Sequence, residues 1–176
     1  MKKTISHTFL ALAAATLASF PVFSSAADAV AKAIIENQGI GFSRVDNGRV
    51  IAYDTVAAFE NHQVLVADCS SYSVEHKGVT WCFSNGENQQ LFEAAINEGR
   101  ENYIPFGGGH CSLGLAFGNL TARGDPRTTV RIGNQLVLNG NFDVRSRFLQ
   151  DSERNLDMAT IRYELAVKDG SLEAND

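Results

Sequence analysis

The stretch Tyr72-Ser-Val-Glu-His-Lys-Gly-Val-Thr-Trp-Cys-Phe83 decides the fold. Apolar and polar residues alternate on both sides of Lys77-Gly78, a pattern typical of a β-hairpin with a two-residue turn. This turn would pair Val74 with Trp81 and Tyr72 with Phe83. The face predicted to be buried then carries Tyr72, Val74, Val79, Trp81 and Phe83. Cys82 is expected on the opposite, polar face, across from Ser73, where it would be accessible.

A helix is predicted directly after the hairpin. Ser84-Asn85-Gly86-Glu87 has the spacing of a capping box, with serine at the N-cap and glutamate three residues later. The helix should run to about Glu98 and stop at Gly99. Its inner face is expected to carry Leu91, Phe92, Ala95 and Ile96.

The segment before the hairpin contains a predicted strand and a short helix. Residues 49–52 favour a strand, and Asp54 can cap a helical turn that runs through Phe59, because its carboxylate can accept a free backbone N–H. Further upstream, residues 29–37 are expected to form a short helix or a flexible leader that Gly39-Ile-Gly41 breaks.

The segment after the hairpin and its helix holds a glycine-rich turn, Pro105-Phe-Gly-Gly-Gly-His-Cys111. A second hairpin is predicted from residues 129–132 and 135–138, around Gly133-Asn134. Asn141 can cap a helix, and a last helix should begin at Asp151 or Ser152 and reach about Val167. From about Lys168 the chain is polar and is expected to fray.

These elements predict a fold of the α+β class: one small domain in which short antiparallel hairpins pack against helices. Aromatic side chains at six positions could line a ligand pocket, but most lie on faces predicted to be buried, so core packing is favoured. The six are Tyr53, Tyr72, Trp81, Phe83, Phe92 and Tyr103.

The first 26 residues have the pattern of a secretory signal peptide. Lys2 and Lys3 precede an apolar run from Phe9 to Phe23, which ends in the small residues Ser24-Ser-Ala-Ala27. The run is shorter than the roughly 20 apolar residues that span a bilayer. The predicted division is therefore a signal peptide at 1–26 and a domain at 27–176, with its core at about 39–161, in a bacterial protein that is periplasmic or secreted.

The charge of the chain excludes two classes of partner. The formal net charge is −5, and loss of Lys2 and Lys3 would make it −7. An acidic chain without a basic cluster is unsuited to nucleic acid or to an anionic membrane surface. No integral membrane segment is expected after cleavage. A metal ion or a small ligand is a possible partner, and the sequence does not identify a protein partner.

Five motifs, in order, resemble the secreted YHS-domain proteins. Their Tyr-Asp-Pro-Val-Ala-Tyr-Phe segment corresponds to Tyr53-Asp-Thr-Val-Ala-Ala-Phe59, and their aromatic hairpin to residues 72–83. Their next helix opens in the manner of Ser84-Asn-Gly-Glu-Asn-Gln-Gln-Leu-Phe92, and their Gly-Gly-Tyr-Cys-Ala corresponds to Gly108-Gly-His-Cys-Ser112. A closing Leu-x-Leu-Asn matches Leu136-Val-Leu-Asn139, so the likeness covers roughly residues 39–161. YHS modules occur in proteins that handle copper and heavy metals, so the resemblance implies copper or another soft metal ion as cofactor.

Cys111 and His110 are the candidate metal ligands. Cys111 follows three glycines and is expected to begin a helix, where backbone N–H groups favour a thiolate, which is a soft-metal ligand. The alternative is a buried cysteine that packs as a small hydrophobe. His110 adds an adjacent nitrogen ligand, but no familiar zinc spacing is present. His110 is a poor catalytic base for Cys111, because neighbouring side chains point in different directions, so an enzyme is not expected.

The other cysteines and the glycines have structural interpretations. Export would place the chain in an oxidising compartment, yet a Cys69–Cys82 bond is not favoured, because the two residues lie about 13 Å apart if the strand continues past Ser73. Such a bond requires the chain to fold back near Ser70. Gly107-Gly-Gly109 could cradle an anion, but a tight turn with positive φ is favoured.

The sequence thus predicts a binding protein rather than an enzyme, with a metal-linked role as the first interpretation. The alternative is a small-ligand or protein-interaction module whose cysteines are purely structural. Exposed, convergent Cys111 and histidine side chains would favour the first. A buried Cys111 beside an apolar cleft would favour the second.

Overall fold

The structure is a computed structural model that describes residues 31–173, so the predicted signal peptide lies outside the described residues. The fold is α+β, as predicted. The strands are β1 (Ala31–Lys32), β2 (Glu36–Asn37), β3 (Ile40–Gly41), β4 (Ser43–Asp46), β5 (Arg49–Ala52), β6 (Ser73–His76), β7 (Val79–Cys82), β8 (Asp125–Ile132), β9 (Gln135–Asn139) and β10 (Leu172–Glu173). The helices are α1 (Thr55–Asn61), α2 (Gly86–Asn97), the 3₁₀ turn η1 (Phe106–Gly109), α3 (Ser112–Ala116), α4 (Phe142–Leu149) and α5 (Ser152–Asp169).

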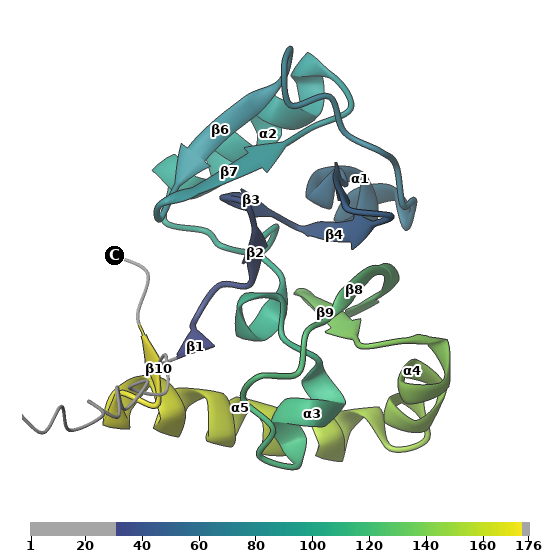
Figure 1. The fold of residues 1–176 in the computed structure, drawn as a ribbon, viewed down its shortest axis with the longest axis vertical. Helices are drawn as coiled ribbons and strands as arrows, with labels where there is room; N and C mark the ends of the chain where they lie inside the picture. Colours follow the sequence, from purple (N-terminus) through teal and green to yellow (C-terminus); the bar gives the residue numbers. More distant parts are fainter. Residues whose placement is uncertain (1–30, 174–176) are drawn as a thin grey trace, which may run out of the picture.

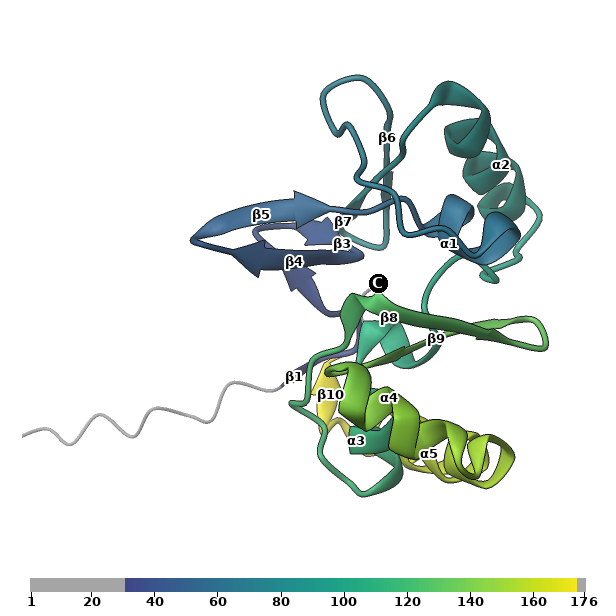
Figure 2. The same cartoon turned by 90° about the vertical axis from the view of Figure 1, so that its right-hand side faces the viewer.

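The strands form several small sheets. A four-stranded sheet has the order β2-β3-β7-β6, while β4-β5, β8-β9 and the parallel pair β1-β10 stand apart. In both ribbon views the β8-β9 hairpin lies between two groups of elements (Figures 1 and 2). One group holds β3 to β7 with α1 and α2, and the other holds α3, α4 and α5. None of the helices in residues 31–173 has the length and apolar character needed to cross a membrane.

The central hairpin has the predicted register. Val74 pairs with Trp81, and Ser73 lies opposite Cys82. Lys77 and Gly78 both have positive φ, 51° and 66°, as a two-residue type I′ turn requires. Val79, Trp81 and Phe83 are buried, as predicted, while Tyr72 and Val74 are half-buried.

Cys69 and Cys82 form a disulfide, so the prediction of an accessible Cys82 without a partner is wrong. Their Cα atoms are 4.8 Å apart. The chain folds back at Asp68, whose carbonyl accepts hydrogen bonds from Ser71 N and Tyr72 N. The predicted distance between Cys69 and Cys82 assumed that the strand continues past Ser73. The chain turns at Asp68 instead, and this turn brings the two cysteines together.

The cap of α2 also differs from the prediction. Asn85, not Ser84, is the N-cap, and its side-chain oxygen accepts a hydrogen bond from Asn88 N at 2.9 Å. Phe92 and Ala95 are buried as predicted, but Leu91 is 41% exposed. Because the helix begins one residue later than expected, Ser84 is available for a contact outside it.

That contact is with Asp54, which is completely buried. Its Oδ1 caps α1 by accepting from Ala57 N at 2.9 Å, as predicted. Its Oδ2 accepts from Ser84 N at 2.7 Å, Ser84 Oγ at 2.6 Å and Asn88 Nδ2 at 2.7 Å. One carboxylate therefore joins the start of α1 to the end of the hairpin and the first turn of α2.

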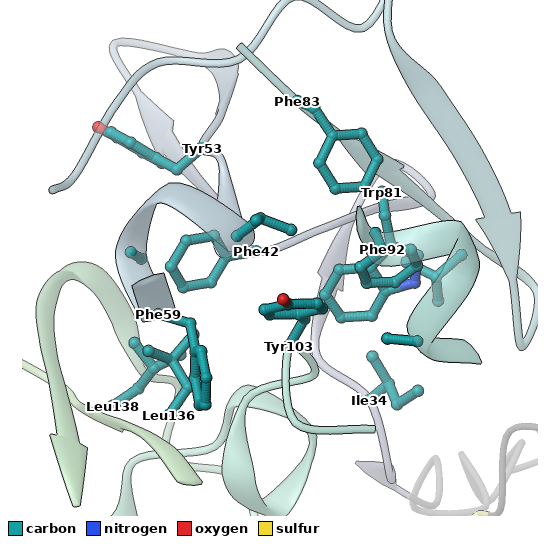
Figure 3. Close-up of a cluster of buried hydrophobic side chains, with 14 residues drawn as sticks. Ile34, Phe42, Tyr53, Phe59, Trp81, Phe83, Phe92, Tyr103, Leu136 and Leu138 are labelled. Atoms are coloured by element: carbon teal, nitrogen blue, oxygen red, sulfur yellow. The ribbon is translucent and has the colours of Figure 1, made fainter. Parts of the chain in front are cut away.

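The predicted aromatic side chains do form a core, which we call the first core. Figure 3 shows Tyr103 between Phe59 and Phe92, with ring centroids 5.3 Å and 6.4 Å away respectively. Phe92 in turn packs on Trp81 at 5.5 Å and on Phe83 at 5.2 Å. The first core thus joins α1, α2 and the hairpin, and it also contacts Leu136 and Leu138 of β9.

A second core lies beneath it, where α5 crosses α3. Its buried residues are Leu115, Ala116 and Ala159, with Phe106, Leu120, Met158 and Tyr163 packed against them. The last two helices begin as predicted. Asn141 caps α4 by accepting from Val144 N, and α5 begins at Ser152.

The two ends of the described chain differ from the prediction. The expected helix or leader at 29–37 contains instead the short strands β1 and β2. The expected frayed tail forms β10, in which Ala31 pairs with Leu172, a buried residue. Packing therefore extends on both sides of the predicted 39–161, because Ala33 and Leu172 bury apolar surface that local patterns do not reveal.

Loss of the Asp54 carboxylate should destabilise the fold strongly. We expect Asp54→Ala to lower the free energy of unfolding by about 3 kcal/mol or more, since it removes a cap and leaves buried donors without an acceptor. The control Asn85→Ala, which removes only the cap of α2, should cost about 1 kcal/mol. The measurement is chemical denaturation followed by the fluorescence of Trp81, the single, buried tryptophan. Equal costs for the two variants would contradict the linking role of Asp54.

The disulfide makes a simple prediction about thiols. The chain has three cysteines, of which Cys111 is free and buried. A thiol reagent should therefore find one thiol per chain in denaturant and three after reduction, and almost none in the native protein. The paired variant Cys69→Ser with Cys82→Ser should lose about 2–4 kcal/mol of stability, because the unfolded chain is no longer cross-linked. Three reactive thiols without reductant would contradict the pairing.

Candidate functional site

The glycine-rich turn before the candidate ligands is tight and buried. Gly107, Gly108 and Gly109 have φ values of 60°, 63° and 89°, so each adopts the left-handed conformation that favours glycine. A Cβ on Gly108 would lie 1.6 Å from the carbonyl oxygen of Ala33. The turn therefore serves close backbone packing, which confirms the structural interpretation of these glycines.

Cys111 is a buried N-cap, 4% exposed. Its sulfur accepts hydrogen bonds from Gly114 N at 3.4 Å and from Gly140 N at 3.3 Å. These bonds fasten α3 to the loop after β9. A cysteine held in this way has a structural role, because it packs in the interior and caps α3. A ligand could reach its sulfur only if the surrounding backbone moved.

His110 is also buried, at 1% exposure. Its Nδ1 lies 2.7 Å from the carbonyl oxygen of Gly107, and its ring lies 6.4 Å from that of Tyr163. Burial lowers the pKa of His110, because the imidazolium would lose its hydration, although the hydrogen bonds to the backbone of Gly107 and Leu120 act in the opposite direction. Burial of the ring therefore favours its neutral form.

His110 and Cys111 do not form a chelating pair. Both have extended backbone angles, with φ/ψ of −64°/157° and −63°/111°, and successive side chains on an extended backbone point to opposite sides. His110 accordingly contacts Gly107, whereas Cys111 contacts Gly140. Across residues 31–173, no three His, Cys, Asp or Glu side chains come together as a metal site. The residues present do not fit a bound soft metal.

The other histidines lie elsewhere. His62 is exposed at the end of α1, and His76 lies in the hairpin, with its Nε2 3.9 Å from Glu101. In the described part of the chain, the hydrogen bonds to the Cys111 sulfur come from backbone amides and not from a histidine. None of these histidines is therefore hydrogen-bonded to the Cys111 sulfur as a base would be.

The surface of the protein has a cleft of about 540 Å³. It opens where the two cores meet, since its wall includes Ile34 and Ile104 of the first core and Phe106 and Tyr163 of the second. The apolar part of the wall consists of Ala33, Ile34, Ile104, Pro105, Phe106 and Val167. A volume of this size is within the range of small-molecule sites, and a largely apolar wall is typical of them.

Charged and amide side chains surround the cleft. Lys77, at the tip of the central hairpin, forms an ion pair with Glu101, with Nζ 2.8 Å from Oε1. Glu164 and Lys168 project from the last turns of α5, and the carboxamides of Asn102, Asn134 and Gln135 complete the rim. The site therefore offers both signs of charge and several uncharged hydrogen-bonding groups.

Tyr163 is the polar residue set into the apolar wall. Its hydroxyl donates to the carbonyl oxygen of Ala33 at 3.2 Å, which ties α5 to the N-terminal segment. Burial raises the pKa of Tyr163, and the negative charge of Glu101 raises it further. The phenol therefore stays protonated, and its ring forms part of the wall beside Phe106, with centroids 6.3 Å apart.

The sequence did not identify this cleft. Its residues come from five separate segments, and no single local motif brings them together. The only available signal was in the last helix, where Tyr163 and Val167 are one turn apart and Glu164 and Lys168 follow the same spacing.

No protein-family model, curated protein or solved structure matches this chain. The site must therefore be interpreted from its own residues and geometry.

The burial of Cys111 and His110 leads to a prediction about copper. Titration of the reduced protein with Cu(I) against a competing chelator should show no tight one-to-one site that Cys111→Ala removes, because two divergent, buried ligands cannot enclose an ion. The variant Cys69→Ser serves as the control for binding at the other thiols. A one-to-one complex that is abolished by Cys111→Ala, but not by Cys69→Ser, would reinstate the predicted metal site.

Proposed function

We propose that this chain is an exported, YHS-like binding protein that holds a small ligand in the cleft between its two cores and performs no catalysis. The observation that carries this proposal is the cleft itself: about 540 Å³, lined by apolar side chains together with charged and amide groups. Such a combination of apolar area and few polar groups is typical of ligand sites.

The state of the cysteines supports a ligand module over a metal-handling role. Cys69 and Cys82 are joined, and Cys111 fastens α3 to the loop after β9. All three are therefore occupied in holding the fold. The disulfide also fits an oxidising compartment, in agreement with the leader pattern at the start of the sequence.

The YHS-like assignment rests on the order and spacing of the sequence motifs. The hairpin with its aromatic face and the aspartate before α1 are the two motifs that organise the first core. The glycine motif at residues 107–109 supplies part of the cleft wall through Gly107 and Gly108. In this proposal the motifs are structural, and the ligand contacts come from residues outside them.

The proposed function can be tested with a neutral apolar probe, N-phenyl-1-naphthylamine, whose fluorescence rises in apolar surroundings. We expect saturable one-to-one binding to the wild-type protein. Val167→Trp fills the cleft from α5 and should weaken binding by about tenfold or more. The matched control is Ile161→Trp, on the same helix at a position that is 59% exposed and outside the cleft, and it should leave binding unchanged.

Two results would contradict the proposal. The first is the absence of saturable binding to the folded wild-type protein. The second is an equal loss of binding in both tryptophan variants, since the probe would then bind elsewhere or report on altered folding. Denaturation curves for both variants separate these causes.

A further inference from the structure

We infer that the cleft accepts a zwitterion of dipeptide size with apolar side chains, an inference that rests on the proposed function. The ligand's side chains would contact the apolar wall, its carboxylate would face Lys168, and its ammonium group would face Glu164. Three features of the cleft carry this inference: the charges left without partners, their spacing, and the composition of the wall.

Two of the four charged residues at the cleft already neutralise each other. Lys77 and Glu101 are 2.8 Å apart at the tip of the hairpin. Glu164 and Lys168, in contrast, have no oppositely charged group within 4.0 Å anywhere in residues 31–173. Both side chains line the cleft and are exposed. They are the charges that a ligand can meet without breaking an existing pair.

The presence of both signs selects the ligand class. A simple anion near Lys168 would also approach Glu164, and a simple cation near Glu164 would approach Lys168. In each case the second charge reduces the attraction that the first provides. A ligand with one positive and one negative end satisfies both residues at once.

The spacing of the two charges indicates the length of the ligand. Glu164 and Lys168 are four residues apart on α5, so their Cα atoms are separated by roughly 6 Å along the helix axis. A free amino acid carries its two charges on one carbon, whereas two extended residues span at most about 7 Å. A dipeptide therefore matches the separation without requiring either side chain to fold back.

The wall and rim fit the rest of such a molecule. Phe106 and Tyr163 offer adjacent aromatic rings, and Ile34, Ile104 and Val167 offer aliphatic surface. A peptide group between the two ends both donates and accepts hydrogen bonds. The carboxamides of Asn134, in the turn between β8 and β9, and of Gln135, the first residue of β9, also both donate and accept.

Calorimetric titration of the full domain with leucyl-phenylalanine tests the inference. Three analogues each remove one feature: the N-acetyl form lacks the ammonium group, the C-terminal amide lacks the carboxylate, and glycyl-glycine lacks the apolar side chains. We expect each analogue to bind more weakly than the parent compound. Each charge at this exposed rim should contribute about two- to fivefold in affinity.

Paired variants assign each charge to its partner. Glu164→Gln should weaken binding of leucyl-phenylalanine. It should leave binding of the N-acetyl form unchanged, because that form has no ammonium group to interact with Glu164. Lys168→Gln should behave in the corresponding way toward the amide. Glu153→Gln, in the first turn of the same helix, is the matched control and should change neither.

The outcomes separate this inference from the proposed function. If N-phenyl-1-naphthylamine binds in the cleft but leucyl-phenylalanine does not, or if all four compounds bind equally, the ligand class is wrong and the binding function stands. If the N-acetyl form or the amide binds more tightly than leucyl-phenylalanine, the inference of a zwitterionic ligand is wrong and a singly charged ligand is indicated. If neither the dye nor the peptide binds, both proposals fail.

Discussion

The fold depends on one buried carboxylate. Asp54 accepts a hydrogen bond from the first turn of α1 through Oδ1, and three more through Oδ2 from Ser84 and Asn88. A charge without water is stable only when it is surrounded by donors, so these elements must meet at this point. With α1 and α2 fixed, Phe59 and Phe92 are brought to opposite sides of Tyr103, and the first core can close. The Cys69–Cys82 bond then holds the loop before the hairpin against its second strand.

The cleft follows from how this core meets the second one. Gly108 is the position at which only glycine allows the backbone to lie against Ala33. The chain passes from the first core to the second just before it, at Pro105, since Ile104 packs against the first core and Phe106 against the second. Side chains on either side of this crossing belong to different cores, and they do not fill the space between them. Several residues of the wall are therefore also part of the two cores, where they contribute to packing. The rim, in contrast, carries charges that no packing requirement explains.

Much of the fold could be predicted from the sequence because it is encoded locally. The register of the central hairpin follows from alternation and a two-residue turn, and the cap of α1 follows from one aspartate. The errors have a different origin. Ser84 resembles a cap in sequence but bonds to Asp54, thirty residues away, and Cys69 reaches Cys82 only because the chain reverses at Asp68. The cleft could not be predicted from the sequence for the same reason, because its wall consists of segments that come together only after folding.

Cys111 and His110 show why adjacency in sequence is weak support for a shared site. Neighbouring residues on an extended backbone project to opposite sides, so two strong ligands next to each other need a local reversal before they can hold one ion. Here the backbone stays extended through both residues, and each side chain satisfies a different part of the interior. Glu164 and Lys168, four positions apart on a helix, share a face without any such reversal. Two residues can contact one ligand when their spacing in the sequence places both side chains on the same face of a helix or strand. That spacing is a better indication of a shared site than the reactivity of the two residues.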